Sequence, residues 1–490
     1  MYQKLLGKTS AILLILPLLF VFFLFSSTFL DNNDFMYSAA PIVWSQNGAL
    51  YRDVPYVQAP LTIFLNLAIM NMFSVENLFM ISRVLSMILV LAAVFLAAFA
   101  LRRTKEPKFI FLFILLCLSN VYILSNGSEM GSYSQPLFLV ALALAISTLD
   151  LAPWLGGLLV GIALGLSVLA KLNFLFVIPA FLLLMWLKTE RSWWTIIFLG
   201  IGALVGMLPL VYYAASDFGT SYQLLVRFHY LTLETRELDP LKSASQIVTQ
   251  LLAFATALAV PAGFLVLRLV SQPSRERWQA WLLALGFLGC GLFMAVVART
   301  IYPQYLAPLV LFLMFFCLPE REAPLEQKHA VWVIGMTFFA IQFSTLLVQT
   351  GQRALNERHL AILEVVKMQR QAEAIAKSLN KCDRRLYSSQ PLFLLSRDVE
   401  YPPELAAGPY LLALRGGSLK PEDIGVDIDA RLKQWAPNLL IYGFYANQDS
   451  NFAEVDAKIQ DYGKERGFET VILGKVTNRE IVISYDKSCL

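Results

Sequence analysis

Apolar segments long enough to cross a lipid bilayer follow one another through the first 350 residues. A hydrocarbon core about 30 Å thick requires about 20 apolar residues in a helix. Of the 490 residues, 57% are hydrophobic and only 15% are charged, which is too apolar for an ordinary soluble enzyme. The sequence therefore predicts a polytopic α-helical membrane protein with about 11 transmembrane helices. The predicted spans lie near residues 11–30, 78–101, 108–125, 135–149, 154–170, 173–187, 192–214, 248–270, 279–298, 304–318 and 330–349.

Two apolar segments near the N-terminus differ from the other predicted spans. Segment 11–30 is too long for a typical signal-peptide core and lacks a small-residue cleavage site, so we interpret it as an uncleaved anchor. Segment 61–74 is shorter and contains Asn66 and Asn71, which favours a helix at the membrane interface over a span.

Lysine and arginine residues cluster in alternate loops between the predicted spans. Cytoplasmic loops carry an excess of these residues, so the pattern predicts a multi-pass protein of the cytoplasmic (inner) membrane with its N-terminus in the cytoplasm. An odd number of spans then places the 31–77 loop and the C-terminal tail on the periplasmic or extracellular side. The basic clusters are residues 4–8, 102–108, 188–191 and 268–277.

The C-terminal tail differs in character from the rest of the chain. Residues 1–350 form the predicted transmembrane domain, 351–380 a helical connector, and 381–490 a soluble α/β domain. The tail has no glycine-rich phosphate loop or nucleophile elbow, so we expect it to act as a lid, a scaffold or a partner-binding domain. The predicted strands are 385–388, 410–414, 438–442, 470–473 and 480–484, and the predicted helices are 421–434 and 451–466.

The tail contains two cysteines, Cys382 and Cys489, which lie beside the first and last predicted strands. If these strands are neighbours in one sheet, an oxidising compartment outside the membrane would permit a disulfide between them. Two unrelated thiols are the alternative, because pairing also requires Cα atoms within about 7 Å. The other cysteines lie in apolar runs and are interpreted as packing residues: Cys117, Cys290 and Cys317.

The loop after the first predicted span carries the most informative pattern. Residues 31–40 read DNNDFMYSAA, and residues 47–61 read NGALYRDVPYVQAPL. Carboxylates directly after a span lie at the membrane surface, where they can meet the polar head of a lipid substrate. The alternative is that Asp31 and Asp34 cap an interfacial helix, since aspartate favours that position.

The sequence after the first span resembles that of the GT-C membrane glycosyltransferases. It has an acid before Tyr-x-x-Ala, then a Tyr-Arg-Asp sequence, then a Pro-Leu at a helix start. The pattern is most similar to the dolichyl-phosphate-mannose protein mannosyltransferases and the lipid A aminoarabinose transferase group. About 11 spans, a long first outer loop and an outer C-terminal domain are also similar to that superfamily. The resemblance implies a GT-C-like fold and glycosyl transfer from a polyisoprenyl-phosphate sugar.

The resemblance also implies roles for residues of this sequence. Asp34 matches the catalytic acid of the loop, with Asp31 as the reserve candidate. Glu129, in the next outer loop, is a candidate to orient the acceptor or a divalent cation. A divalent cation is the one possible cofactor. The alternative is that Glu129 is a solvated turn residue, as a lone glutamate in a polar loop often is. Gln58-Ala59-Pro60-Leu61 departs from the family by lacking a basic residue. The candidate substrate-binding residues of the first loop are Tyr37, Tyr51, Arg52 and Asp53.

Cations at the outer ends of spans are candidates to contact the donor phosphate. Lys171 lies between two apolar segments, where a charge is costly unless it snorkels or pairs with an anion. Arg299 precedes Tyr302 and Tyr305 in a segment that resembles the family's Arg-Tyr-x-x-Pro. His229 is the one histidine expected near this face, although a lone interfacial histidine is more often structural. No residue is assigned as a metal ligand.

We interpret the chain as a hexosyl- or pentosyltransferase that moves a sugar from a polyisoprenyl-phosphate donor to a glycan, lipid or protein acceptor, with no role for nucleic acid. Asp34 is the general base that accepts the proton of the acceptor hydroxyl. The alternatives are a transporter or flippase of a lipid-linked saccharide, and a structural or regulatory membrane subunit. The residues do not identify the sugar or the acceptor.

Overall fold

The computed structural model describes residues 2–28, 30, 32–189, 192–228, 259, 262–267, 282, 285–286, 288–290, 303–357, 361–408, 426–445, 451–476 and 479–490. The chain divides into two compact units. The first unit comprises Met1–Ser26, Leu85–Leu208 and Leu238–Arg353. The second unit comprises Ser27–Val84, Pro209–Glu237 and Ala354–Leu490.

Most of the described chain is helical, and many of these helices are apolar. Within the described residues, four segments are long and apolar enough to cross a membrane: Val75–Leu101, Pro153–Ala170, Trp193–Ser216 and Leu325–Gln352. They correspond to η1 (Val75–Asn77) with α4 (Leu78–Leu101), α8 (Pro153–Ala170), α10 (Trp193–Ser216) and most of α16 (Leu325–Glu357). The fold class predicted from the sequence, a polytopic helical protein with a small C-terminal α/β domain, is confirmed.

Shorter or bent apolar helices lie at the other predicted spans that the structure describes. Two bent pairs join α1 (Tyr2–Thr28) to α2 (Asn32–Asn47), and α5 (Pro107–Ser119) to α6 (Val121–Leu124). The predicted interfacial segment 61–74 is a helix, α3 (Leu61–Met72). Most of the predicted spans 248–270 and 279–298 lie outside the described residues, so the number of spans stays a prediction. The other short apolar helices are α7 (Ser134–Ser147), η3 (Leu172–Val177) with α9 (Ile178–Lys188), and α15 (Pro303–Cys317).

Helix α10 has exposed aromatic residues at both ends. Trp193 and Trp194 are 68% and 65% exposed at its start, and Tyr212 is 73% exposed near its end. At 1.5 Å per residue, Trp193 and Tyr212 are about 28 Å apart along the helix, close to the thickness of a bilayer core. Aromatic side chains at both interfaces are typical of membrane spans.

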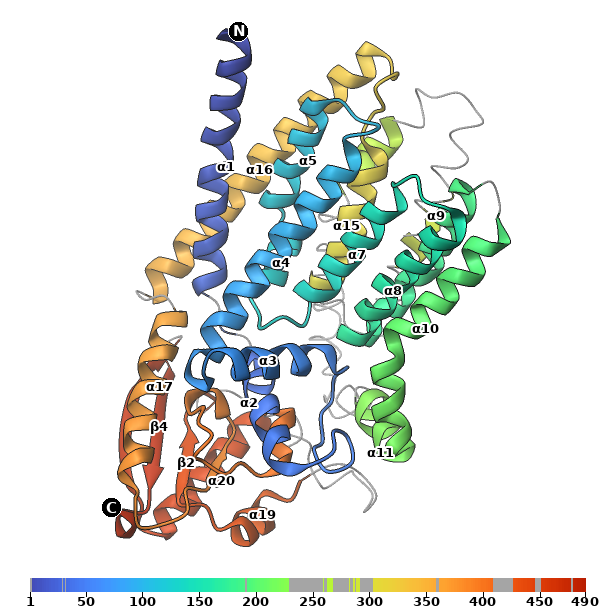
Figure 1. Ribbon diagram of the computed structural model, residues 1–490. Coiled ribbons are helices and arrows are strands. Elements are labelled where there is room, and N and C mark those ends of the chain that lie inside the picture. Colours follow the sequence, from blue (N-terminus) through green and yellow to red (C-terminus); the bar gives the residue numbers. More distant parts are fainter. Residues whose placement is uncertain are drawn as a thin grey trace, which may run out of the picture. The chain divides into compact units, whose positions relative to one another are not determined.

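Glycines allow α8 and α10 to pack with their backbones in contact; the two helices lie side by side in Figure 1. A Cβ atom added at Gly161 of α8 would lie 2.2 Å from the carbonyl oxygen of Leu199 in α10. Small residues at four-residue intervals permit this close approach between membrane helices. The glycines at this contact are Gly157, Gly161 and Gly165 of α8, and Gly202 and Gly206 of α10.

The described residues of the tail form a four-stranded sheet in the order β1-β2-β4-β3. Strand β1 (Leu386–Ser388) is parallel to β2 (Leu439–Tyr442), whereas β4 (Arg479–Tyr485) is antiparallel to β2 and to β3 (Glu469–Val476). These strands confirm four of the five predictions, and the fifth, 410–414, lies outside the described residues.

Helices cover the sheet of the tail, and Figure 1 shows α20 beside β2. Helix α17 (Ala361–Ser378) packs on β3, and α20 (Asn451–Glu465) packs on β2. Helix α20 matches the predicted 451–466, whereas α19 (Ile428–Trp435) begins after the predicted start at 421 because Asp427 caps it through the amides of Asp429 and Ala430. Residues 421–425 lie outside the described part of the chain.

Of the two interpretations of the tail cysteines, the disulfide is confirmed. The expectation that the strands beside them are neighbours is wrong, because β2 lies between β1 and β4. Cys382 and Cys489 are bonded, with their Cα atoms 5.3 Å apart. The bond joins the segment that follows α17 to the C-terminal turn η7 (Lys487–Cys489).

Helix α2 of the first loop packs against the tail within the second unit. It contacts η5 (Pro391–Phe393) and η6 (Pro403–Ala407), which follow β1 in the chain. The side-chain amide of Gln46 donates a hydrogen bond to the backbone carbonyl of Val399 at 2.8 Å. The first loop and the tail therefore share one packed core. The division into 1–350, 351–380 and 381–490 stays a prediction.

Candidate active site

Asp34, the residue predicted to be the catalytic base, lies in the first turn of α2 and pairs with Arg83 of α4. A guanidinium nitrogen of Arg83 lies 3.2 Å from a carboxylate oxygen of Asp34, and both side chains are fully buried. A helix N-terminus favours a negative charge, as the capping interpretation requires. The buried guanidinium of Arg83 is a further, specific partner for this carboxylate. An aspartate that only capped a helix at the surface would not need such a partner.

Polar side chains beside this ion pair connect α2, α3 and α4. Ser82 of α4 donates a hydrogen bond to the side-chain oxygen of Asn66 in α3 at 2.8 Å. The amide of Asn66 donates to the carbonyl of Tyr37 in α2 at 3.0 Å. All three residues are buried, so these bonds fix the helix that carries Asp34 to its two neighbours. The substrate-binding role of Tyr37 stays a prediction.

Tyr51, Arg52 and Asp53 lie in a tight turn of the first loop. Tyr51 is fully buried with φ +67°, and its hydroxyl donates to the carbonyl of Gln58 at 2.8 Å. Burial raises the pKa of Tyr51 well above its usual value, so this group remains a donor. Arg52 and Asp53 are exposed and pair at 2.8 Å. These partners lie within the loop, and the predicted contacts with substrate remain untested.

Asp53 also closes the turn by accepting a hydrogen bond from the amide of Ala49 at 2.9 Å. The hydrogen bond from Arg52, followed by the one from Ala49, lowers the pKa of Asp53 to about 2. Asp53 is therefore ionised at neutral pH.

Glu129 and Lys171 belong to the first unit, where Tyr133 links their segments. Glu129 is fully buried and accepts a hydrogen bond from Ser132 at 3.3 Å. Lys171 directly follows α8, and its ammonium lies 3.6 Å from the ring centroid of Tyr133. The structure therefore brings Lys171 to the loop that carries Glu129.

Five predicted site residues cannot be placed as side chains. Tyr305 lies in α15, with its side chain outside the described set. The other four lie outside the described residues altogether: Asp31, His229, Arg299 and Tyr302. The roles predicted for these five residues stay predictions.

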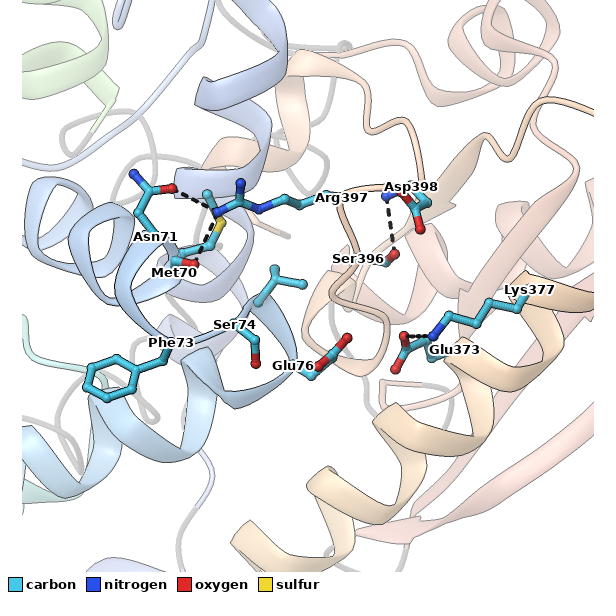
Figure 2. Close-up of a pocket in the computed structure, with 11 residues that line it drawn as sticks. Met70, Asn71, Phe73, Ser74, Glu76, Glu373, Lys377, Ser396, Arg397 and Asp398 are labelled. Carbon is cyan, nitrogen blue, oxygen red and sulfur yellow. Dashed lines mark hydrogen bonds and ion pairs between the residues drawn. The ribbon is translucent and has the colours of Figure 1, made fainter.

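A cavity of about 380 Å³ opens within the second unit (Figure 2), and none of the predicted site residues lines it. Its walls come from the end of α3, η1, α17 and residues 396–398. Arg397 donates to the carbonyl of Met70 at 3.1 Å and to the side-chain oxygen of Asn71 at 2.8 Å. Lys377 pairs with Glu373 at 2.5 Å. Both of these cations thus have partners among the residues that line the cavity.

Sequence reasoning missed Arg83. Its signal was available, because an ionised residue inside the predicted span 78–101 is costly unless it has a partner. Among the described residues, no group of three or more His, Cys, Asp or Glu side chains could hold a metal ion.

Comparisons with known proteins reveal similarity in structure alone. No protein-family model and no curated protein matches the sequence. The crystal structure of ArnT from Cupriavidus metallidurans bound to undecaprenyl phosphate superposes with a TM-score of 0.62 at 12% identity, covering 98% of this chain and 99% of that one. The chain has the ArnT fold. The apo structure of ArnT gives a TM-score of 0.59 at 13% identity, covering 99% of each chain.

The ArnT fold extends over nearly the whole chain, including the tail. The resemblance to GT-C transferases that rested on the pattern after the first span is thus confirmed for the fold. An identity of 12% carries no residue roles.

Proposed function

We propose that this protein transfers a sugar from a polyisoprenyl-phosphate donor to an acceptor at the outer face of the cytoplasmic membrane. The observation that carries the proposal is the ArnT fold over the full chain, with a buried carboxylate, Asp34, in the loop helix after the first span. One ArnT structure holds undecaprenyl phosphate, which supports a donor on the same kind of lipid. The acceptor is a glycan, a lipid or a protein.

The reaction breaks the bond between the sugar carbon and the phosphate oxygen and forms a bond from that carbon to the acceptor oxygen. Asp34 accepts the proton of the acceptor hydroxyl, as a general base. The lipid phosphate leaves with the bonding electrons, and nearby cations stabilise its developing charge. Lys171 and Arg299 are the proposed cations. Inversion at the sugar carbon is what the GT-C resemblance implies.

Arg83 has two roles in this scheme. A cation beside a carboxylate favours its ionised form, which is the form that accepts a proton. The hydrogen bond also fixes the direction of the carboxylate. Because both side chains are fully buried, the acceptor hydroxyl can reach Asp34 only after the residues that cover its carboxylate move.

The test is a transfer assay in liposomes with purified full-length protein and a radiolabelled polyisoprenyl-phosphate sugar. Glycan, lipid and protein acceptors from bacterial membranes are supplied in separate reactions. We expect label in one class of acceptor, and one polyisoprenyl phosphate released for each sugar transferred. Labelled donor that crosses the bilayer intact, without release of lipid phosphate, would instead identify a flippase and refute the proposal.

A further inference from the structure

Phe35, the residue after Asp34, lies among three aromatic rings of the tail. Its ring centroid lies 5.8 Å from that of Phe393, 5.1 Å from that of Phe444 and 6.2 Å from that of Tyr445. Phe35 is fully buried. Two separate tail segments supply these rings, namely η5 after β1 and the turn after β2. We call these three rings the Phe35 clamp.

The two segments of the clamp are joined by one carboxylate, that of Asp456 in α20. One of its oxygens accepts hydrogen bonds from the amides of Gly443 and Tyr445, at 3.0 and 2.8 Å. The other accepts from the hydroxyl of Ser389 and from the amide group of Gln390. Asp456 is only 2% exposed. Its partners therefore come from both segments that hold Phe35.

The geometry around the clamp leaves little freedom. Gly443 has φ +111°, and a Cβ atom there would lie 2.3 Å from the carbonyl oxygen of Glu480. A Cβ atom on Gly408 would lie 3.0 Å from the backbone of Met36, the residue after Phe35. The tail thus contacts α2 at two successive residues beside Asp34. Both oxygens of Asp456 accept hydrogen bonds, one from each of the two segments, so Asp456 is the main tie between them.

We propose that Asp456 is a positioning residue, whose carboxylate fixes the Phe35 clamp and thereby fixes the rotation of α2 that aims Asp34. This inference rests on the proposed function. Because Phe35 and Asp34 are consecutive on one rigid helix, a shift of the ring moves the carboxylate with it. A misplacement of about 1 Å at a reacting group can reduce the rate by about 100-fold. The tail then acts on the reaction without contacting the substrate.

The test compares the full-length variants Asp456→Asn and Ser484→Ala. The asparagine keeps the size of Asp456 but replaces one acceptor oxygen with an amide that cannot accept. Ser484→Ala removes hydrogen bonds to Tyr442 at 2.9 Å and Thr470 at 3.0 Å inside the same sheet, so it weakens the tail without changing the clamp. We expect Asp456→Asn to lower kcat about 10- to 100-fold with an unchanged KM for the donor. Ser484→Ala should keep the wild-type kcat.

Hydrogen exchange of the amides of α2 provides a readout that does not depend on activity. Exchange over Asn32–Asn47 should accelerate in Asp456→Asn and not in Ser484→Ala. If Asp456→Asn does not fold, Phe444→Leu removes one ring of the clamp and should give the same two changes. Unchanged kcat and unchanged exchange in the folded clamp variant would overturn the positioning role. Wild-type protein with no transfer activity would instead contradict the proposed function, while the exchange experiment would still decide whether Asp456 holds α2.

Discussion

At the scale of single residues, Asp34 and Arg83 form an ion pair that is buried away from water. Each alone would be costly to bury, and their attraction offsets that cost only while both are present. The pair therefore has a structural role whatever its chemical role. A loss of activity in an Asp34 variant is informative only when the stability of the variant is measured too.

Arg83→Met should destabilise the protein by about 3–5 kcal/mol, because it leaves the carboxylate of Asp34 buried without its cation. The double variant Asp34→Asn/Arg83→Met should recover most of this loss, since no charge is left unpaired. Thermal unfolding of the purified proteins in detergent measures both effects. The double variant should remain inactive in sugar transfer. An Arg83→Met protein as stable as the wild type would contradict the pair.

Tyr133 permits a matched test of the site around Lys171. Tyr133→Phe keeps the ring under the ammonium, whereas Tyr133→Leu removes it. A cation–π contact is worth about 0.5–2 kcal/mol, so the leucine variant should raise the KM for the donor about 2- to 30-fold. The phenylalanine variant should stay near the wild type. Equal KM values for the two variants would mean that the ring does not position Lys171 for the phosphate.

At the scale of helices and strands, the glycine contact between α8 and α10 has a clear control. A Cβ atom at Gly161 meets the backbone of α10, whereas one at Gly200 meets nothing within 4 Å. Gly161→Ala should therefore lower the unfolding temperature. Gly200→Ala should leave it unchanged or raise it slightly, because alanine favours a helix by about 1 kcal/mol. If Gly161→Ala unfolds at the wild-type temperature, the two helices do not pack with their backbones in contact.

The elements of the tail were largely predictable, but the contacts that connect them to α2 were not. Short apolar segments that alternate with amphipathic helical ones predicted β1, β2, β3 and β4, and a bond was one of two interpretations of the two tail cysteines. Asp456 looked like one polar residue of an amphipathic helix. Its burial depends on how the turn after β2 folds over α20, which is set by contacts between residues far apart in the chain.

Residues of the candidate site could be predicted only where a local sequence pattern indicated them. Asp34 follows from the acid and Tyr-x-x-Ala after the first span. Arg83 carries no such pattern, and its pairing with Asp34 joins residues 49 positions apart. Tyr133 likewise showed no sign of its contact with Lys171, because that contact depends on where α8 ends.

At the scale of the whole molecule, the contacts of α2 with the tail bear on membrane topology. Segments that share hydrogen bonds cannot lie on opposite sides of a bilayer, so the first loop and the tail face the same side. This agrees with the prediction from the distribution of Lys and Arg, which places both outside the cytoplasm.

Single cysteines introduced as Ser45→Cys in α2 and Lys475→Cys in β3 should both react with a membrane-impermeant reagent applied outside the cell. Arg103→Cys, in the loop between α4 and α5, is the control and should react only after the membrane is opened. All three positions are exposed. Labelling of Arg103→Cys from outside, with Ser45→Cys and Lys475→Cys protected, would invert the topology and remove the active site from the outer face.

The rate of sugar transfer by Asp34→Asn tests the account most directly. Removal of a general base typically costs about 10²- to 10⁴-fold in rate, and asparagine keeps the size of Asp34 and can still hydrogen-bond to Arg83. We predict a loss of that size in a protein whose unfolding temperature in detergent shows that it is still folded, because Asp34→Asn also removes the charge that pairs with Arg83. Asp31→Asn should have a milder effect in the same assay. Asp34→Asn protein that transfers sugar at the wild-type rate would contradict the account.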